Sequence, residues 1–272
     1  MSSDEQRTGE SGVGMLRWRV SPSRKRRRLT LSGGVAFVSA LLAIVSLAFA
    51  MQRASEEDQS RLRSDLTSII RRVTALNGKE TLTQAQANEL AALLAQAKAI
   101  FPQLDSVPAV YYSEISYALL KGYYYGDSLE YAEKALRQAK DDEDVIQEIV
   151  ARQYSAATYR TLQDFRKMRS EYSQAVALSE KAQEGPDYFA ASELGIATLR
   201  VWGNAEARSG ACDQAASIFA SAVRRAESNN VARSHWLATI ASARDRALKT
   251  CQQAKSAGAS ARASAEPPRQ RP

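Results

Sequence analysis

The longest uncharged segment of the chain, residues 29–52, constrains its organisation more than any other feature. It reads LTLSGGVAFVSALLAIVSLAFAMQ and lies between Arg28 and Arg53. As an α-helix this segment would be about 36 Å long, enough to cross a hydrocarbon core of about 30 Å. We therefore expect one transmembrane helix, Leu29–Gln52, that anchors the protein in a membrane.

The charges on the two sides of this segment predict its orientation. Residues 1–53 contain nine Lys and Arg against three Asp and Glu, whereas the rest of the chain contains 28 against 27. Because basic residues beside a span stay in the cytoplasm, we expect residues 1–28 to form a disordered cytoplasmic tail. Residues 54–272 are then exported across the inner membrane, into the periplasm or its equivalent. The near-neutral exported part argues against nucleic-acid binding.

Two alternatives to this topology stay open. Val35–Leu47 has the length of a signal-peptide core, and Ala48-Phe49-Ala50 is a small-x-small cleavage pattern. Cleavage after Ala50 would release a secreted helical-repeat protein. In an inverted topology the large domain would be a cytoplasmic regulator, and a reporter fused after residue 60 would be active only in the cytoplasm.

The exported part is predicted to be all-α. Pro102, Pro108 and Pro186 are the only prolines between the span and residue 266, and they separate segments rich in strong helix formers. No segment alternates polar and apolar residues as a strand would. The expected helices cover residues 54–76, 82–100, 108–122, 127–140, 144–162, 165–183, 187–209, 212–228 and 231–254. Residues 54–108 form a juxtamembrane helical segment, and residues 255–272 are expected to be a disordered tail.

A spacing of small and aromatic residues recurs in the second half of the chain. Its members are Gly203, Ala215, Phe219 and Ala222, then Ala156, Met168, Tyr172 and Ala175, and in weaker form Ser116, Ser128, Ala132 and Ala135. The pattern resembles the tetratricopeptide repeat over residues 109–228. It departs from the family at Arg152 and Glu206, and its spacings of 40 and 47 residues exceed the family period of about 34.

This resemblance implies an α-solenoid of antiparallel helix pairs over residues 109–254, closed by a C-terminal capping helix. The first helices of the pairs would then build a concave face for partners. Several side chains expected there look like the clamps that some tetratricopeptide proteins use to hold carboxylates; the alternative is a solvated polar face. The expected partner-binding residues are Tyr117, Lys121, Gln153, Arg160, Arg200, Asn204 and Arg208.

Tyrosines are concentrated just before and within the first repeat. Seven of the eleven lie between residues 111 and 131: Tyr111, Tyr112, Tyr117, Tyr123, Tyr124, Tyr125 and Tyr131. Tyr is common at interfaces because it combines a large apolar ring with a polar tip. Packing between helices explains the cluster equally well.

Both cysteines lie in the exported part. In the hairpin arrangement, with a turn near Asn229-Asn230, residue 247 would lie opposite Cys212, and Cys251 is about one helical turn further on. A small shift in pairing would bring the two sulfurs together. We therefore predict a disulfide between Cys212 and Cys251, as an oxidising compartment permits. The alternative is a pair of free, buried thiols.

Little in the sequence supports catalysis. His235 is the only histidine, which leaves few metal sites or general bases, and no glycine-rich phosphate loop is present. We expect no catalytic residue, cofactor or metal. The predicted function is a membrane-anchored interaction module, a scaffold or chaperone-like adaptor that binds polypeptides. The alternative is an envelope hydrolase that uses carboxylates, with Glu114, Glu193 and Glu206 as candidates by elimination.

Overall fold

A computed structural model describes residues 31–182, 187–229 and 233–265 of the chain. Its contacts divide the chain into two units, Met1–Ala54 and Ser55–Pro272. Helix α1, Leu31–Asn77, begins in the first unit and ends in the second. The predicted tail 1–28, residues 29 and 30, and most side chains of the predicted span lie outside the described part. Within the described part, no helix combines the length and the hydropathy that a membrane crossing requires.

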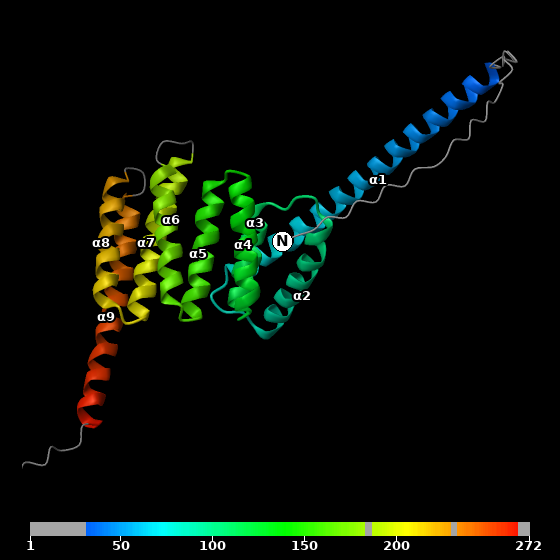
Figure 1. Cartoon of the computed structure of the whole chain (residues 1–272). Helices are drawn as coiled ribbons and strands as arrows, with labels where there is room; N and C mark the ends of the chain where they lie inside the picture. The colour runs from blue at the N-terminus through cyan, green and yellow to red at the C-terminus, as the bar shows by residue number, and fades with distance from the viewer. Residues whose placement is uncertain (1–30, 183–186, 230–232, 266–272) are drawn as a thin grey trace, which may run out of the picture. The chain divides into compact units, whose positions relative to one another are not determined.

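The described part of the second unit is entirely helical. It contains the end of α1 and eight further α-helices, which pack one after another (Figure 1). Their bounds are Gln84–Ile100 (α2), Ala109–Lys121 (α3), Tyr125–Asp141 (α4), Val145–Thr161 (α5), Phe165–Lys181 (α6), Tyr188–Arg208 (α7), Cys212–Ser228 (α8) and Arg233–Ala265 (α9); a short 3-10 helix, η1, covers Phe101–Gln103.

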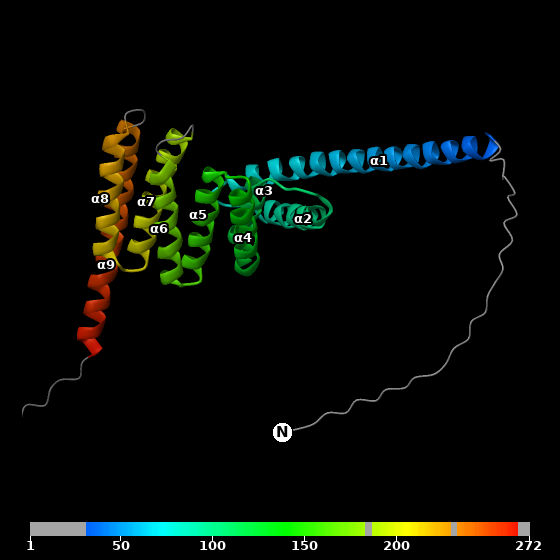
Figure 2. The same ribbon diagram turned by 45° about the horizontal axis from the view of Figure 1, so that its top comes forward.

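The helices from α3 onward form antiparallel pairs. α3 packs with α4, α5 with α6, and α7 with α8, while α9 packs on both members of the last pair. The first helices also contact one another in sequence, α3 with α5, α5 with α7 and α7 with α9. Figure 2 shows the same stack of helices from a second direction. The predicted arrangement of antiparallel helix pairs is confirmed at this level.

Apolar side chains hold the first helices together. Leu66, Val73 and Leu76 of α1 are almost completely buried against Leu90 of α2 and Ile115 of α3. The 3-10 helix contributes to the same core, because the Phe101 ring lies 5.0 Å from the ring of Tyr112. The end of α1 is therefore an integral part of the helical stack.

Close packing of small residues brings the later pairs together, as the repeat pattern requires. A methyl group added at Gly203 of α7 would lie 2.9 Å from the Phe219 ring of α8, so only glycine fits there. In the weakest repeat, two serines replace this contact by hydrogen bonds. Ser116 Oγ donates to the Ser128 carbonyl at 2.8 Å, and Ser128 Oγ donates to the Ser116 carbonyl at 2.9 Å.

Four turns between consecutive helices share one backbone conformation. Tyr123, Glu143, Gln163 and Gly210 each have a φ between 55° and 84°, the left-handed region. The N–H of the next residue then bonds to the carbonyl five positions back, as in Asp164 to Tyr159 at 2.9 Å. This hydrogen bond closes the end of the first helix. The turns are therefore equivalent, although only one of them carries glycine.

This equivalence gives a test of the turn geometry. Gly210→Ala is expected to lower the free energy of unfolding by about 1 kcal/mol. The position has free space for a methyl group, so the loss comes from the left-handed backbone conformation, which alanine adopts only with strain. Gln163→Gly is expected to raise it by about 0.5–1 kcal/mol, because glycine adopts this φ without strain. Urea unfolding followed by circular dichroism measures both effects. Equal effects of the same sign would contradict the shared geometry.

One predicted boundary is corrected by the structure. Disorder was expected from residue 255, yet α9 continues to Ala265. The physical reason is that every second residue from 257 to 265 is alanine, which has the highest helix propensity, and the next proline is Pro267. Residues 266–272 lie outside the described part.

Candidate functional site

The predicted binding residues lie on three successive first helices. Tyr117 and Lys121 belong to α3, Gln153 and Arg160 to α5, and the remaining three to α7. Since α3, α5 and α7 contact one another in this order, these residues come from one row of helices. Their environments differ greatly, however, and only part of the row is open to a ligand.

The two residues on α3 take part in contacts with other helices. Lys121 Nζ donates to the backbone carbonyls of Asn77 at 2.9 Å and of Lys79 at 2.5 Å. Its charge thus lies at the C-terminal end of α1, where a cation is favourable. The Tyr117 ring stacks on that of Tyr154, with 5.1 Å between the ring centroids. Both side chains join helices together.

The two residues on α5 are also partly occupied. Gln153 Nε2 donates to Thr198 Oγ1 on α7 at 2.6 Å, which links two first helices. Arg160 is half-buried. Its positive charge acts on Tyr172, whose pKa burial nevertheless raises to about 12. The Tyr172 hydroxyl stays protonated at neutral pH and has no hydrogen-bond partner within the described part.

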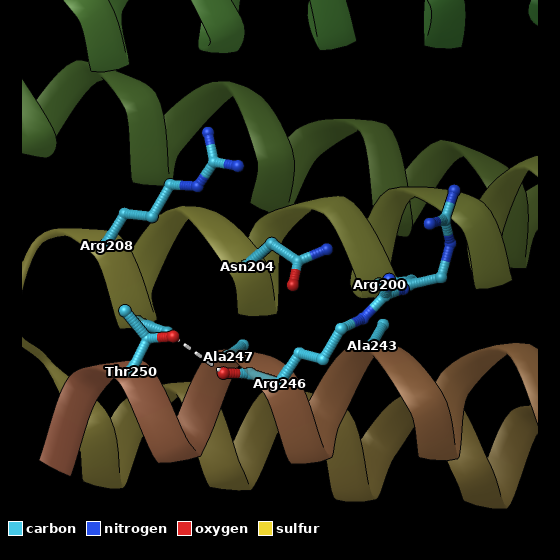
Figure 3. Close-up of a pocket in the computed structure, with 8 residues that line it drawn as sticks. Arg200, Asn204, Arg208, Ala243, Arg246, Ala247 and Thr250 are labelled. Atoms are coloured by element: carbon cyan, nitrogen blue, oxygen red, sulfur yellow. Dashed lines mark hydrogen bonds between the residues drawn. The ribbon is translucent and has the colours of Figure 1, made fainter. Parts of the chain in front are cut away.

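The three residues on α7 line a groove together with α9. Arg200, Asn204 and Arg208 form one wall and Arg246 and Thr250 the other, around a volume of about 430 Å³. Figure 3 shows these side chains on the two neighbouring helices that border the groove. Three alanines complete the lining: Ala207, Ala243 and Ala247. We call this site the α7/α9 groove.

The groove carries positive charge that no neighbouring acid neutralises. None of its lining residues is Asp or Glu. Arg200 and Arg208 make no ion pair or hydrogen bond with the part of the chain that the structure describes, and Arg200 Nε is buried. Arg246 Nε donates only to the Ser242 carbonyl of its own helix, at 3.2 Å. Three guanidinium groups in one hollow favour an anionic ligand, since arginine binds carboxylates by paired hydrogen bonds.

The wall formed by α9 was missed by the sequence analysis, which assigned this helix only a capping role. A signal was present in the spacing. Ala243 and Ala247 are four residues apart, as are Arg246 and Thr250, so each pair lies along one side of the helix. Recognising these residues as a wall required knowing that α9 packs beside α7.

A disulfide fixes α9 at this place. Cys212 at the start of α8 is bonded to Cys251, with 5.8 Å between the Cα atoms, and both residues are buried. The predicted pairing is confirmed. Cys251 directly follows Thr250, so the bond holds the groove wall next to its last lining residue. Such bonds persist in oxidising compartments, which supports an extracytoplasmic location.

The two positions that depart from the tetratricopeptide pattern both hold ion pairs between helices. Arg152 of α5 donates to Glu171 of α6 at 2.9 Å and also binds Glu148. Glu206 of α7 is completely buried and accepts two hydrogen bonds from Arg169 of α6, both at 2.8 Å. This hydrogen bonding raises the pKa of Arg169 above its usual value. The departures therefore replace apolar contacts by charged ones.

These contacts bear on the three carboxylates considered for hydrolysis. Glu206 also accepts from Trp202 Nε1 at 2.9 Å, so its two oxygens are engaged by the surrounding side chains. Glu114 accepts from Asn77 Nδ2 at 3.0 Å. Glu193 is half-buried on α7. None of the three lines the α7/α9 groove.

The tyrosine cluster divides into packed and exposed members. Tyr112 and Tyr131 pack around Phe101, with ring centroids 5.0 and 5.7 Å from it. Burial raises the pKa of Tyr131 to about 12. Tyr123 and Tyr124, in the turn before α4, are instead 78% and 56% exposed. Packing therefore accounts for the core of the cluster, while these two rings remain available at the surface.

Comparison with known proteins identifies no relative of this chain. No family model matches the chain, and neither do the curated proteins or the solved structures that were searched. The fold and the groove define the class: an all-α protein of sequentially packed antiparallel helix pairs, with a cationic groove beside its last helix.

Proposed function

We propose that the protein is a membrane-anchored, extracytoplasmic interaction module of the tetratricopeptide-like type, a scaffold or adaptor that binds polypeptides. The α7/α9 groove carries this proposal. It presents Arg200, Arg208 and Arg246 without a neutralising acid in its lining. These three guanidinium groups make no ion pair with the described part of the chain, and they are well suited to hold an acidic partner.

The membrane anchor in this proposal rests on the uncharged residues 29–52 and the basic residues before them. Two described side chains near the end of that segment, Leu47 and Phe49, are 63% and 61% exposed. Large apolar side chains exposed on one helix are stabilised by lipid contact. The disulfide between Cys212 and Cys251 supports an extracytoplasmic location for the helical stack.

In-cell photo-crosslinking tests this function. A photoreactive residue at Asn204, inside the groove, is expected to give defined protein adducts in intact cells. The matched control is Ala220, an exposed position on α8, which is expected to give none of these adducts. Introducing Arg208→Glu together with Arg246→Glu should abolish the adducts from position 204. Adducts of equal yield from both positions, or none from 204, would count against an interaction module.

A further inference from the structure

We propose that the α7/α9 groove binds an extended acidic segment of its partner through two carboxylate side chains spaced four residues apart. This inference rests on the proposed function and specifies its ligand. It follows from three properties of the groove: the spacing of its charges, the chemistry between them and the uneven distribution of guanidinium groups along it.

The spacing of charges selects an extended ligand. Arg200 and Arg208 lie on one side of α7, eight residues apart, which corresponds to about 12 Å along the helix axis. In an extended peptide, side chains at positions i and i+4 point to the same side and lie about 13 Å apart. In a helical peptide the same two positions are only about 6 Å apart. Acidic side chains four positions apart can therefore reach both arginines from an extended peptide but not from a helical one.

The chemistry between the two arginines favours a peptide backbone. Asn204 lies midway and offers both a hydrogen-bond donor and an acceptor, which match the C=O and N–H of a peptide unit. Ala207, Ala243 and Ala247 leave space for that backbone to approach. An inorganic polyphosphate lacks the donor that would satisfy the Asn204 carbonyl. The lining thus fits a polypeptide better than a polyphosphate.

The two ends of the groove differ in charge. Figure 3 shows the Arg246 side chain extending along the groove toward Arg200, whereas Arg208 lies at the other end near Thr250. Arg200 Nε is buried and has no acceptor within the described part. A carboxylate at this end would meet two guanidinium groups, those of Arg200 and Arg246. The acidic side chain bound at the Arg200 end should therefore contribute more to affinity than the one bound at Arg208.

Fluorescence anisotropy on the full-length protein in a non-ionic detergent tests the spacing. The probe is a fluorescein-labelled 12-residue peptide of Ser, Thr and Gly with glutamates at positions 4 and 8. One control peptide has its glutamates at positions 4 and 5, with the same net charge, and a second has glutamine at 4 and 8. We expect the peptide with glutamates at 4 and 8 to bind at least about fivefold more tightly than the peptide with glutamates at 4 and 5. The glutamine peptide should not bind measurably.

Substitutions locate the binding in the groove. Arg208→Glu and Arg246→Glu change exposed side chains and should leave the fold intact, as circular dichroism would verify. Each is expected to weaken peptide binding by about tenfold or more. Arg224→Glu makes the same charge change on the exposed surface of α8 and should leave the affinity unchanged.

Three results would overturn the inference. The first is equal affinity for the two glutamate spacings, which would indicate simple charge attraction. The second is unchanged binding by Arg208→Glu and Arg246→Glu. The third is displacement of the peptide by inorganic tripolyphosphate at lower concentration than by unlabelled peptide, which would assign the groove to phosphate. If photo-crosslinking from Asn204 still yields adducts, only the acidic ligand is refuted; if it yields none, the interaction function itself fails.

Discussion

Glu206→Ala is expected to lower the free energy of unfolding by about 3 kcal/mol, because it removes the buried carboxylate of an ion pair with Arg169. The Glu206 side chain is completely buried, and its oxygens accept hydrogen bonds from Arg169 and Trp202. Removing it leaves the Trp202 N–H without this acceptor and opens a cavity. The loss lies at the lower end of the range for broken buried pairs because Arg169 is 39% exposed and can recover solvation.

The asymmetry of this pair provides the sharper test. Arg169→Leu leaves a carboxylate with no exposure to solvent, so it should cost more than Glu206→Leu, which leaves a partly hydrated guanidinium. The double variant Arg169→Leu/Glu206→Leu should recover most of the loss, since an apolar pair suits this position. Urea unfolding of the four proteins completes a double-mutant cycle. Equal costs for the two single variants would show that burial of the carboxylate is not the dominant factor.

Removal of the disulfide is expected to cost about 4 kcal/mol, the chain-entropy value for a closed loop of this length. The bond joins residues 39 positions apart and attaches α9 to the start of α8. Because α9 forms one wall of the α7/α9 groove, the double variant Cys212→Ser/Cys251→Ser should also bind the acidic peptide more weakly. Unfolding midpoints and anisotropy measure the two effects on the same samples.

A reducing agent separates the bond from the substitutions. With dithiothreitol, the unfolding midpoint of the wild-type protein should fall to that of the double serine variant, whereas the variant itself should not respond. A wild-type midpoint that is the same with and without reductant, after full reduction is shown by thiol labelling, would contradict a stabilising role for the Cys212–Cys251 bond.

The positions of the helices could be predicted closely from the sequence because the residues that start and end a helix lie next to it in the chain. The start of α5 is an example: Asp144 immediately precedes the helix, and its Oδ1 accepts from the Gln147 N–H at 2.9 Å. Asn77-Gly78 marks the end of α1 in the same way. The disulfide was also predictable, because the register of one hairpin determines which residues of two antiparallel helices meet.

The binding site could be predicted only in part, because it depends on contacts between distant helices. Arg200, Asn204 and Arg208 were expected on the concave face that the tetratricopeptide resemblance implies. Lys121 and Gln153 have the same chemistry in the sequence, yet they bond to the end of α1 and to Thr198. Whether a polar side chain faces a ligand or a neighbouring helix is decided by packing, which the residue pattern does not contain.

The placement of the disulfide has a consequence for how long the protein survives. Terminal elements fray first, and frayed helices are the preferred sites of proteolytic cleavage. The groove is built on such an element, α9, yet Cys251 keeps this helix attached to α8. A molecule with reduced Cys212 and Cys251 would therefore offer proteases a loosely held α9 and should be cleaved faster there than the oxidised protein.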